Sequence, residues 1–204
     1  MRSPATASSA AAPRACSIGP SHHADFKARH FQNAKHSRPP LGAVAVDTDV
    51  CARLRHDPDI IRSDAAHQHE HCLEVQLPFL QVVLGAFTLV PLLTGRASTA
   101  DVARVLEAAW GDVGTIVVVS SDLSHYLAYA AARSLDAGTA ASIAARAELR
   151  DPSRACGALA INGLLARARA LDLAIEELAR LNSGDTAGDR ARVVGYGAWC
   201  LHAA

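Results

Sequence analysis

The chain of 204 residues contains few aromatic side chains, which make up only 4% of it, and it has no excess of charge of either sign. Twenty Lys and Arg residues balance twenty Asp and Glu residues. Surfaces that bind nucleic acid depend on stacked aromatic rings or on clustered basic charge. We therefore expect no nucleic-acid partner. An apolar run of the length that a membrane span needs is also absent, so we expect no membrane partner.

Cysteine pairs of the CxxC type are absent as well. The five cysteines are scattered and odd in number, which argues against both a disulfide framework and a zinc ribbon. This pattern predicts a reducing, cytoplasmic setting. Hydrophobic residues make up 50% of the chain, enough to form a sizeable core in a chain of this length.

Strand-like and helix-like segments alternate, which predicts an α/β fold with a mixed sheet flanked by helices in a single domain. The run Thr115–Val119 is β-branched and continuous, as in a central strand covered on both faces. The other expected strands lie at 16–19, 44–46, 87–95 and 191–201. The expected helices lie at 50–56 after a cap at Asp47 or Thr48, at 98–110 after a cap at Ser98 or Thr99, and at 129–147 and 153–170.

The densest group of chemically active side chains lies in the stretch AHQHEHCLEVQLPFLQ, residues 66–81. If this stretch is helical, His67, Glu70, His71 and Glu74 lie on one face. Apolar sequence follows at once, so this face should be partly buried, where imidazoles and carboxylates must pair or hold a metal. The residues from His67 to Glu74 are therefore candidate metal ligands, or outer residues that orient ligands, and the alternative is a solvated helix start.

The same stretch matches the zinc signature H-x-x-E-H at His67, Glu70 and His71. A zinc hydrolase of this kind needs a further carboxylate ligand, for which Glu107 and Glu148 are the candidates. The short motif predicts a zinc hydrolase only weakly, and we keep it as a third reading.

Two polar turns follow expected strands. Gly19 and Pro20 form a turn with His22 and His23 at its mouth, and Ser120, Ser121, Asp122 and His125 follow the strand Thr115–Val119. Ligand sites in α/β sheets form beyond the carboxyl ends of strands. Asp122 and His125 could act as an acid–base pair, and Ser121 would line the same pocket. The alternatives are a surface turn and a helix cap.

Cys156 lies near the start of an alanine-rich helix. A helix N-terminus favours the thiolate, which is the form that binds metal. The alternative is a small residue of the core.

Five segments together resemble one family. They are GPSHH at 19–23, EHCLEVQLPFLQ at 70–81, VVVSSDLSHYL at 117–127, ACGA at 155–158 and NSGDTAGDRARVVGYGAW at 182–199. In this order and spacing they resemble the Memo family, whose prokaryotic members are called AmmeMemoRadiSam system protein B. The resemblance runs from about residue 16 to the end of the chain.

The family is similar in fold to class III extradiol dioxygenases, which are non-haem iron enzymes. The resemblance implies a metal-sized pocket with His22 and Cys156 as ligands and iron or copper as the cofactor. It places His125 where related dioxygenases keep an acid–base histidine, with Asp122 as its partner. Glu70 and His71 would line the pocket, and His23, His67 or His71 could substitute for a missing ligand.

The family's PHAGY motif, which holds a third ligand, is absent, and residues 24–38 do not match the family. We therefore expect a disordered leader at 1–15, a Memo-like domain at 16–204 that lacks N-terminal strands, and an incomplete site. The predicted function is metal-dependent redox chemistry, of the dioxygenase type, on an unknown small molecule. The alternative is a non-enzymatic module that binds a peptide or protein in the same pocket.

Overall fold

The computed structural model describes residues 13–20, 41–68, 70–110, 114–186 and 188–203, and the backbone of 29–31 and 36–37. Its strands are β1 (Arg14–Pro20), β2 (Arg29–Phe31), β3 (His36–Ser37), β4 (Val44–Val46), β5 (Ile60–Arg62), β6 (Thr88–Thr94), β7 (Thr115–Val119), β8 (His125–Leu127), β9 (Ala174–Asn182) and β10 (Val193–His202). Its helices are α1 (Thr48–Leu54), α2 (Asp64–His67), α3 (Leu77–Leu84), α4 (Thr99–Trp110), α5 (Tyr129–Ala144) and α6 (Ala158–Ala170), with the 3₁₀ turns η1 (Pro152–Arg154) and η2 (Ser183–Asp185).

The larger sheet is mixed, with the order β3-β4-β6-β1-β7, and β2 also pairs with β6 while β5 pairs with β2. Strands β4, β6, β1 and β7 run parallel, whereas β2 is antiparallel to β6 and β3 is antiparallel to β4. A smaller antiparallel sheet has the order β8-β10-β9. This arrangement confirms the α/β class with a mixed sheet flanked by helices.

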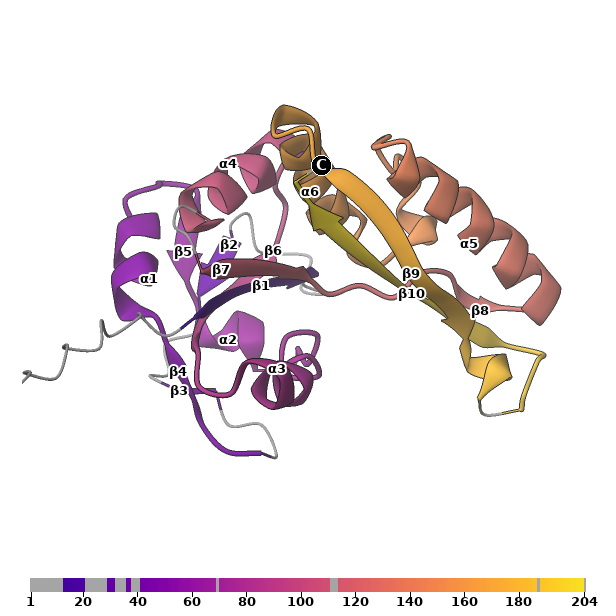
Figure 1. The fold of residues 1–204 in the computed structure, drawn as a ribbon, viewed down its shortest axis with the longest axis horizontal. Coiled ribbons are helices and arrows are strands. Elements are labelled where there is room, and N and C mark those ends of the chain that lie inside the picture. Colours follow the sequence, from indigo (N-terminus) through magenta and orange to yellow (C-terminus); the bar gives the residue numbers. More distant parts are fainter. Residues whose placement is uncertain are drawn as a thin grey trace, which may run out of the picture.

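Apolar side chains cover the two faces of the larger sheet alternately. Cys16 and Ile18 of β1 pack into the main core with residues of α1, α4 and α6, whereas Ala15 packs with Leu77 of α3 on the opposite face. Figure 1 shows α4 and α6 on one side of β1 and β7, and α2 and α3 on the other. The period of two along a strand therefore places one helical layer on each face.

The helix boundaries follow the expected caps. The Asp47 carboxylate accepts a hydrogen bond from the Val50 N–H and caps α1 at 2.9 Å. Ser98 precedes α4, and its hydroxyl accepts a hydrogen bond from the Asp101 N–H at 3.1 Å while Asp101 accepts one from the Ser98 N–H. This reciprocal pair satisfies two amide donors at the helix start.

The strand β7 corrects one expectation. Among the described strands it lies at the edge of the sheet, beside β1 alone, so its placement at the centre of the sheet was wrong. Ile116 is 38% exposed, and no residue of β7 is fully buried. A run of β-branched residues indicates a strand that packs on its faces, but it carries no information about which edges are paired.

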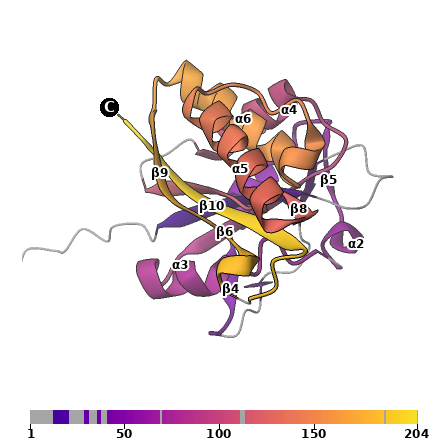
Figure 2. The same ribbon diagram turned by 90° about the vertical axis from the view of Figure 1, so that its right-hand side faces the viewer.

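The smaller sheet is built on the hairpin of β9 and β10, which is paired from Ala174 with His202 to Asn182 with Gly195. The hairpin extends away from the larger sheet beside α5 (Figure 1). Figure 2 shows α5 and α6 on one side of this hairpin and α3 on the other. None of the helices in the described part of the chain is both long enough and apolar enough to span a membrane.

Candidate metal centre

Asp122, His125 and Cys156 each present a possible metal-ligand atom, and these three atoms lie within 4.8 Å of one another. Of these atoms, His125 Nε2 and Asp122 Oδ2 are 3.6 Å apart. All three residues are partly buried. The group combines one thiol, one imidazole and one carboxyl around a common point, and it is the one such cluster found in the described part of the chain.

The loop that carries Asp122 and His125 is tied to both sheets. The Ser120 N–H donates to the Ile18 carbonyl at 2.9 Å, which continues the pairing of β7 with β1. Farther along, the Leu123 N–H donates to the Gly195 carbonyl and the Gly195 N–H donates to the Ser124 carbonyl, both at 2.8 Å. The loop therefore bridges the edge of β7 and the start of β10, and its backbone is fixed on either side of Asp122.

Asp136 supports this loop from α5, and the sequence analysis did not single it out. Its carboxylate is 2% exposed and accepts a hydrogen bond from the Ser124 N–H at 3.0 Å. A Cβ atom at Gly195 would lie 2.1 Å from the Asp136 carboxylate oxygen, so only glycine fits there. Asp136 is the one acidic residue in the alanine-rich helix α5, and this single carboxylate is the signal that could have marked it.

Cys156 lies directly before Gly157, the N-cap residue of α6. The Asp122 N–H donates to the Cys156 sulfur at 3.2 Å, and the Ser121 hydroxyl lies 3.6 Å from the same sulfur. The structure thus places Cys156 at a helix start, as predicted, and brings it to the loop after β7.

Gly157 allows this close approach. A Cβ atom at this position would lie 2.7 Å from the Ser121 Cβ and 3.0 Å from the Ser120 carbonyl oxygen. Without a side chain, the Gly157 N–H reaches the Ser121 hydroxyl and donates to it at 2.8 Å. The pair Cys156–Gly157 therefore works as a unit, since the glycine brings the cysteine against the loop.

The histidine-rich stretch does not form one helix, so the face expected from its spacing is not formed. Ser63 caps α2, which ends at His67, and the chain then passes through turns before α3 begins at Leu77. Pro78 lies in the first turn of α3, where proline is tolerated, and this limits how far α3 can extend toward the N-terminus. The side chains therefore diverge: His67 and Glu70 are buried, and His71 is exposed.

Cys72, in the same turns, packs against the end of β1. Its thiol donates to the Pro20 carbonyl at 3.5 Å, and a Cβ atom at Gly19 would lie 2.5 Å from its sulfur. Burial raises the pKa of Cys72 to about 12, with further contributions from the charges of Glu70, Glu74 and Cys156. Cys72 is therefore a neutral thiol that holds the turn to β1.

The zinc reading finds no support in this geometry. Within the described residues, His67, Glu70 and His71 are not part of any three-donor cluster. Of the two candidate additional ligands, Glu107 pairs with Arg167 at 3.1 Å and Glu148 accepts a hydrogen bond from Thr99 at 2.8 Å. His22 and His23, the other predicted site residues, lie outside the described residues.

Comparisons with known proteins identify the family. The profile of the family described as "Memo-like protein" matches residues 5–200. This chain belongs to the Memo-like family. It is 32% identical to a MEMO1 family protein of Ignicoccus hospitalis over 202 aligned positions, which cover 89% of this chain and 69% of the relative.

Two further MEMO1 family proteins match similarly. The protein of Aeropyrum pernix is 31% identical, with 88% of this chain and 69% of the relative covered. The protein of Sulfolobus acidocaldarius is 35% identical, with 77% of this chain and 60% of the relative covered. The matches therefore cover between 60% and 69% of the length of these three relatives.

Proposed function

We propose that Asp122, His125 and Cys156 form a mononuclear transition-metal site, and that this Memo-like protein is a metal-dependent oxidoreductase that acts on a small molecule. The observation that supports the proposal is the convergence of three donor atoms of different chemistry within 4.8 Å. The residues come from two separate parts of the chain, which the packing of α6 on the loop after β7 brings together.

The donor set fits iron or copper. Thiolate and imidazole ligands favour iron, copper or zinc over the harder cations magnesium and calcium. Three protein donors also leave coordination positions open for a substrate. When bound, iron or copper would supply one-electron redox chemistry at this position, and the resemblance to class III extradiol dioxygenases points to oxidation of a small molecule such as a catechol.

The spacing of Asp122 and His125 favours ligation over a direct acid–base pair. Their nearest atoms are 3.6 Å apart, which is longer than an N–H···O hydrogen bond. Two ligand atoms that each lie about 2.0–2.2 Å from one ion have roughly this separation. We therefore assign both side chains to the metal, in place of the acid–base role that the sequence suggested.

Ser121 would position the cysteine ligand. Its hydroxyl accepts a hydrogen bond from the Gly157 N–H, donates to the Asp122 carbonyl at 2.7 Å, and lies against the Cys156 sulfur. These contacts fix the distance between the loop and the start of α6. Outer contacts of this kind orient metal ligands and hold them ready for the ion.

Metal titration of protein purified without a histidine tag tests the site. We expect the wild type to bind Fe(II) under anaerobic conditions, or copper, at near one ion per chain. Cys156→Ala should weaken this binding by more than about 100-fold, because losing a ligand should exceed the 10- to 100-fold effect of losing an outer-shell partner. Cys200→Ala is the matched control, since Cys200 is an exposed cysteine of β10 that is not part of the cluster.

Absence of binding in the wild type, or equal binding by Cys156→Ala, would overturn the metal site. Oxygen uptake by the iron-loaded protein with a panel of catechols tests the reaction separately. Metal binding without uptake would remove the dioxygenase reaction and leave the site itself in place.

A further inference from the structure

Tyr126 lies inside strand β8 with a left-handed backbone. Its φ angle is 57°, a conformation that bulky side chains rarely adopt. Two other described residues that are not glycine have a positive φ, Arg146 and Asp172, and each follows the end of a helix. A left-handed residue is usual at a helix end. Of the three, Tyr126 alone is not explained by a helix end.

This left-handed residue forms a β-bulge. Strand β10 pairs Val193 with Leu127 and Val194 with His125. Neighbours on β10 therefore face residues two positions apart on β8, and Tyr126 is an extra residue between them. Bulges with a left-handed residue are normally built on glycine, and bulges beside active sites redirect a side chain. Because a shift of one residue turns the side chains of a strand to its opposite face, the extra residue sets the direction in which His125 leaves β8.

The ring of Tyr126 contacts the imidazole of His125. The two ring centroids lie 5.9 Å apart in an edge-on arrangement, with 66° between the ring planes. The guanidinium carbon of Arg192, the residue before β10, lies 5.0 Å from the centroid of the Tyr126 ring, which is within the range of a cation–π interaction. Arg192, Tyr126 and His125 therefore form a series of contacts that ends at the candidate metal centre.

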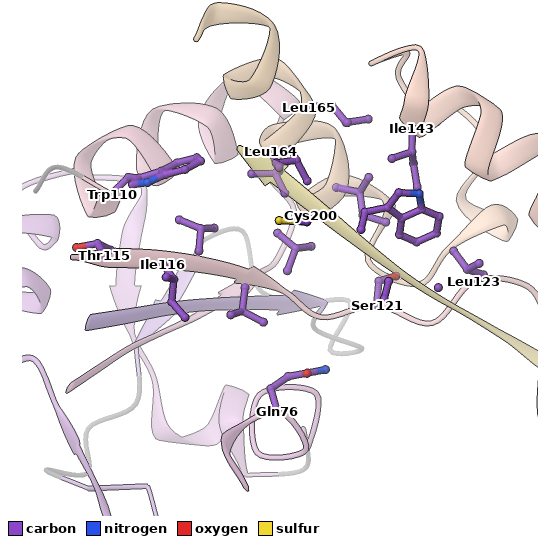
Figure 3. A pocket seen from close by; sticks show the side chains of 18 residues that line it. Gln76, Trp110, Thr115, Ile116, Ser121, Leu123, Ile143, Leu164, Leu165 and Cys200 are labelled. Atoms are coloured by element: carbon purple, nitrogen blue, oxygen red, sulfur yellow. The ribbon is translucent and has the colours of Figure 1, made fainter. Parts of the chain in front are cut away.

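The imidazole of His125 is not held by hydrogen bonds. Metal-bound histidines normally donate their second ring N–H to an outer partner. Within the described residues the imidazole makes no hydrogen bond, and its Nε2 atom lies 3.6 Å from the Asp122 carboxylate. Ser121 and Leu123 of the same loop line an apolar cavity of about 530 Å³ (Figure 3), whose wall does not include His125. The imidazole must therefore be oriented from the side of β8.

Burial does not account for the tyrosine at this position. The side chain of Tyr126 is 63% exposed, so it adds little to the core. A left-handed backbone at a bulky residue costs free energy and persists only where the surrounding structure imposes it. Strain of this kind is concentrated at functional sites, and Tyr126 directly follows a candidate ligand.

We propose that Tyr126 is a positioning residue of the metal centre. The bulge aims His125 toward Asp122 and Cys156, and the ring, held by Arg192, limits the rotation of the imidazole. This inference rests on the proposed function, because it takes His125 to be a metal ligand.

Metal titration of the full chain compares two replacements of Tyr126. Tyr126→Gly keeps a left-handed backbone, which glycine adopts freely, and removes the ring. We expect it to weaken Fe(II) or copper binding about tenfold, as for loss of an outer-shell partner, and to leave the midpoint of urea unfolding unchanged or higher. Tyr126→Phe keeps the ring and should keep wild-type affinity. The EPR spectrum of the copper-loaded protein should change in Tyr126→Gly alone, because it reports the geometry of the ligands.

Two exposed arginines provide a matched pair of variants. Arg192→Gln removes the cation over the Tyr126 ring and should weaken metal binding about two- to fivefold. Arg190→Gln removes the same charge from a similar contact, since the Arg190 guanidinium carbon lies 4.4 Å from the centroid of the Tyr129 ring. Tyr129 is not next to a candidate ligand in the chain, so we expect Arg190→Gln to bind metal as the wild type does.

NMR of the metal-free protein separates this inference from the metal site. We expect the His125 side chain to hold one χ1 rotamer in the wild type and in Tyr126→Phe, and to sample several rotamers in Tyr126→Gly. A wild type that binds no metal but shows this difference would overturn the proposed function and support the positioning of His125 by Tyr126.

Two results would overturn the inference. The first is a His125 side chain that is as ordered in Tyr126→Gly as in the wild type. The second is an equal loss of metal affinity in Arg192→Gln and Arg190→Gln, which would make the effect one of net charge. If Tyr126→Gly does not fold, the order of the His125 side chain in Arg192→Gln decides: less order than in Arg190→Gln supports the inference, and equal order overturns it.

Discussion

The stretch from His67 to Glu74 and the loop from Ser120 to His125 both carry histidine and acidic side chains, and the first is richer in them. Yet of the two, in the part of the chain that the structure describes, only the loop contributes to a three-donor cluster, and its third donor, Cys156, lies more than thirty positions away. Local density of metal-binding residues is therefore a weaker guide to a site than the ends of strands and helices are.

The physical cause of the difference lies in the backbone. The turns between α2 and α3 send successive side chains in different directions, so that Glu70 is buried and His71 is exposed. The loop after β7 is instead held at Ser120, Leu123 and Ser124 by hydrogen bonds to β1, β10 and α5. Fixed backbone on both sides allows Asp122 and His125 to converge on Cys156.

Replacing one histidine of each region by alanine should give the largest difference in metal affinity. His125→Ala should lower the affinity for Fe(II) or copper by about 100-fold or more, because it removes one of three donors. His71→Ala should leave the affinity unchanged, since His71 is exposed and belongs to no cluster in the described residues. Isothermal titration of metal-free protein measures both.

Loss of affinity in His71→Ala but not in His125→Ala would place the metal in the histidine-rich turns instead of the loop after β7. If both variants bind the metal normally, His125 is not a ligand. A changed pH profile of oxygen uptake in His125→Ala would then return it to the acid–base role.

Removal of the Ser121 hydroxyl should have a smaller effect on the same site. Ser121→Ala deletes the hydrogen bond from the Gly157 N–H and the contact with the Cys156 sulfur. We expect metal affinity to fall by about 10- to 100-fold, as for other outer-shell partners. Ser153→Ala is a suitable control, because Ser153 lies nearby in sequence and its hydroxyl donates to the Asp151 carboxylate, away from the cluster. Unchanged affinity in Ser121→Ala would show that the ligands are held without this contact.

Features set by neighbouring residues could be predicted from the sequence, and features set by contacts across the fold could not. The strand Thr115–Val119, the cap at Asp47 and the polar loop after β7 follow from local rules, since β-branching and capping act within a few residues. The edge position of β7 and the support from Asp136 depend on pairing across the fold, which no local pattern encodes.

The strand β9 shows the limit of local propensity most clearly. Its sequence AIEELARLN is rich in Ala, Leu and Glu, which favour helix, and the sequence analysis assigned no strand there. In the structure it pairs with β10 along its whole length. Pairing with a long neighbouring strand overrides a weak local preference, and the partner could not be identified from the segment itself.

Replacement of Glu74 should have the smallest effect, a change in stability alone, and it tests whether the histidine-rich turns have only a structural role. Burial raises the pKa of the Glu74 carboxyl above its ordinary value, and Glu70 adds to this, whereas its own backbone N–H and His71 oppose it. A raised carboxyl pKa in the folded state stabilises the fold at pH values below the unfolded pKa, and this stabilisation is lost as the pH rises through the folded pKa. The ionised Glu74 carboxylate therefore slightly destabilises the folded protein at neutral pH.

Glu74→Gln removes this charge and should stabilise the protein near neutral pH. The gain should be less than about 1 kcal/mol, because solvent screens a partly exposed carboxyl. The gain should shrink toward zero at about pH 4, where the wild-type carboxyl takes up its proton in both states. Urea unfolding at both pH values measures it, with Glu176→Gln on the exposed face of β9 as the control. If Glu74→Gln instead weakened metal binding, the turns would belong to the metal centre, and the separation between the two regions would fail.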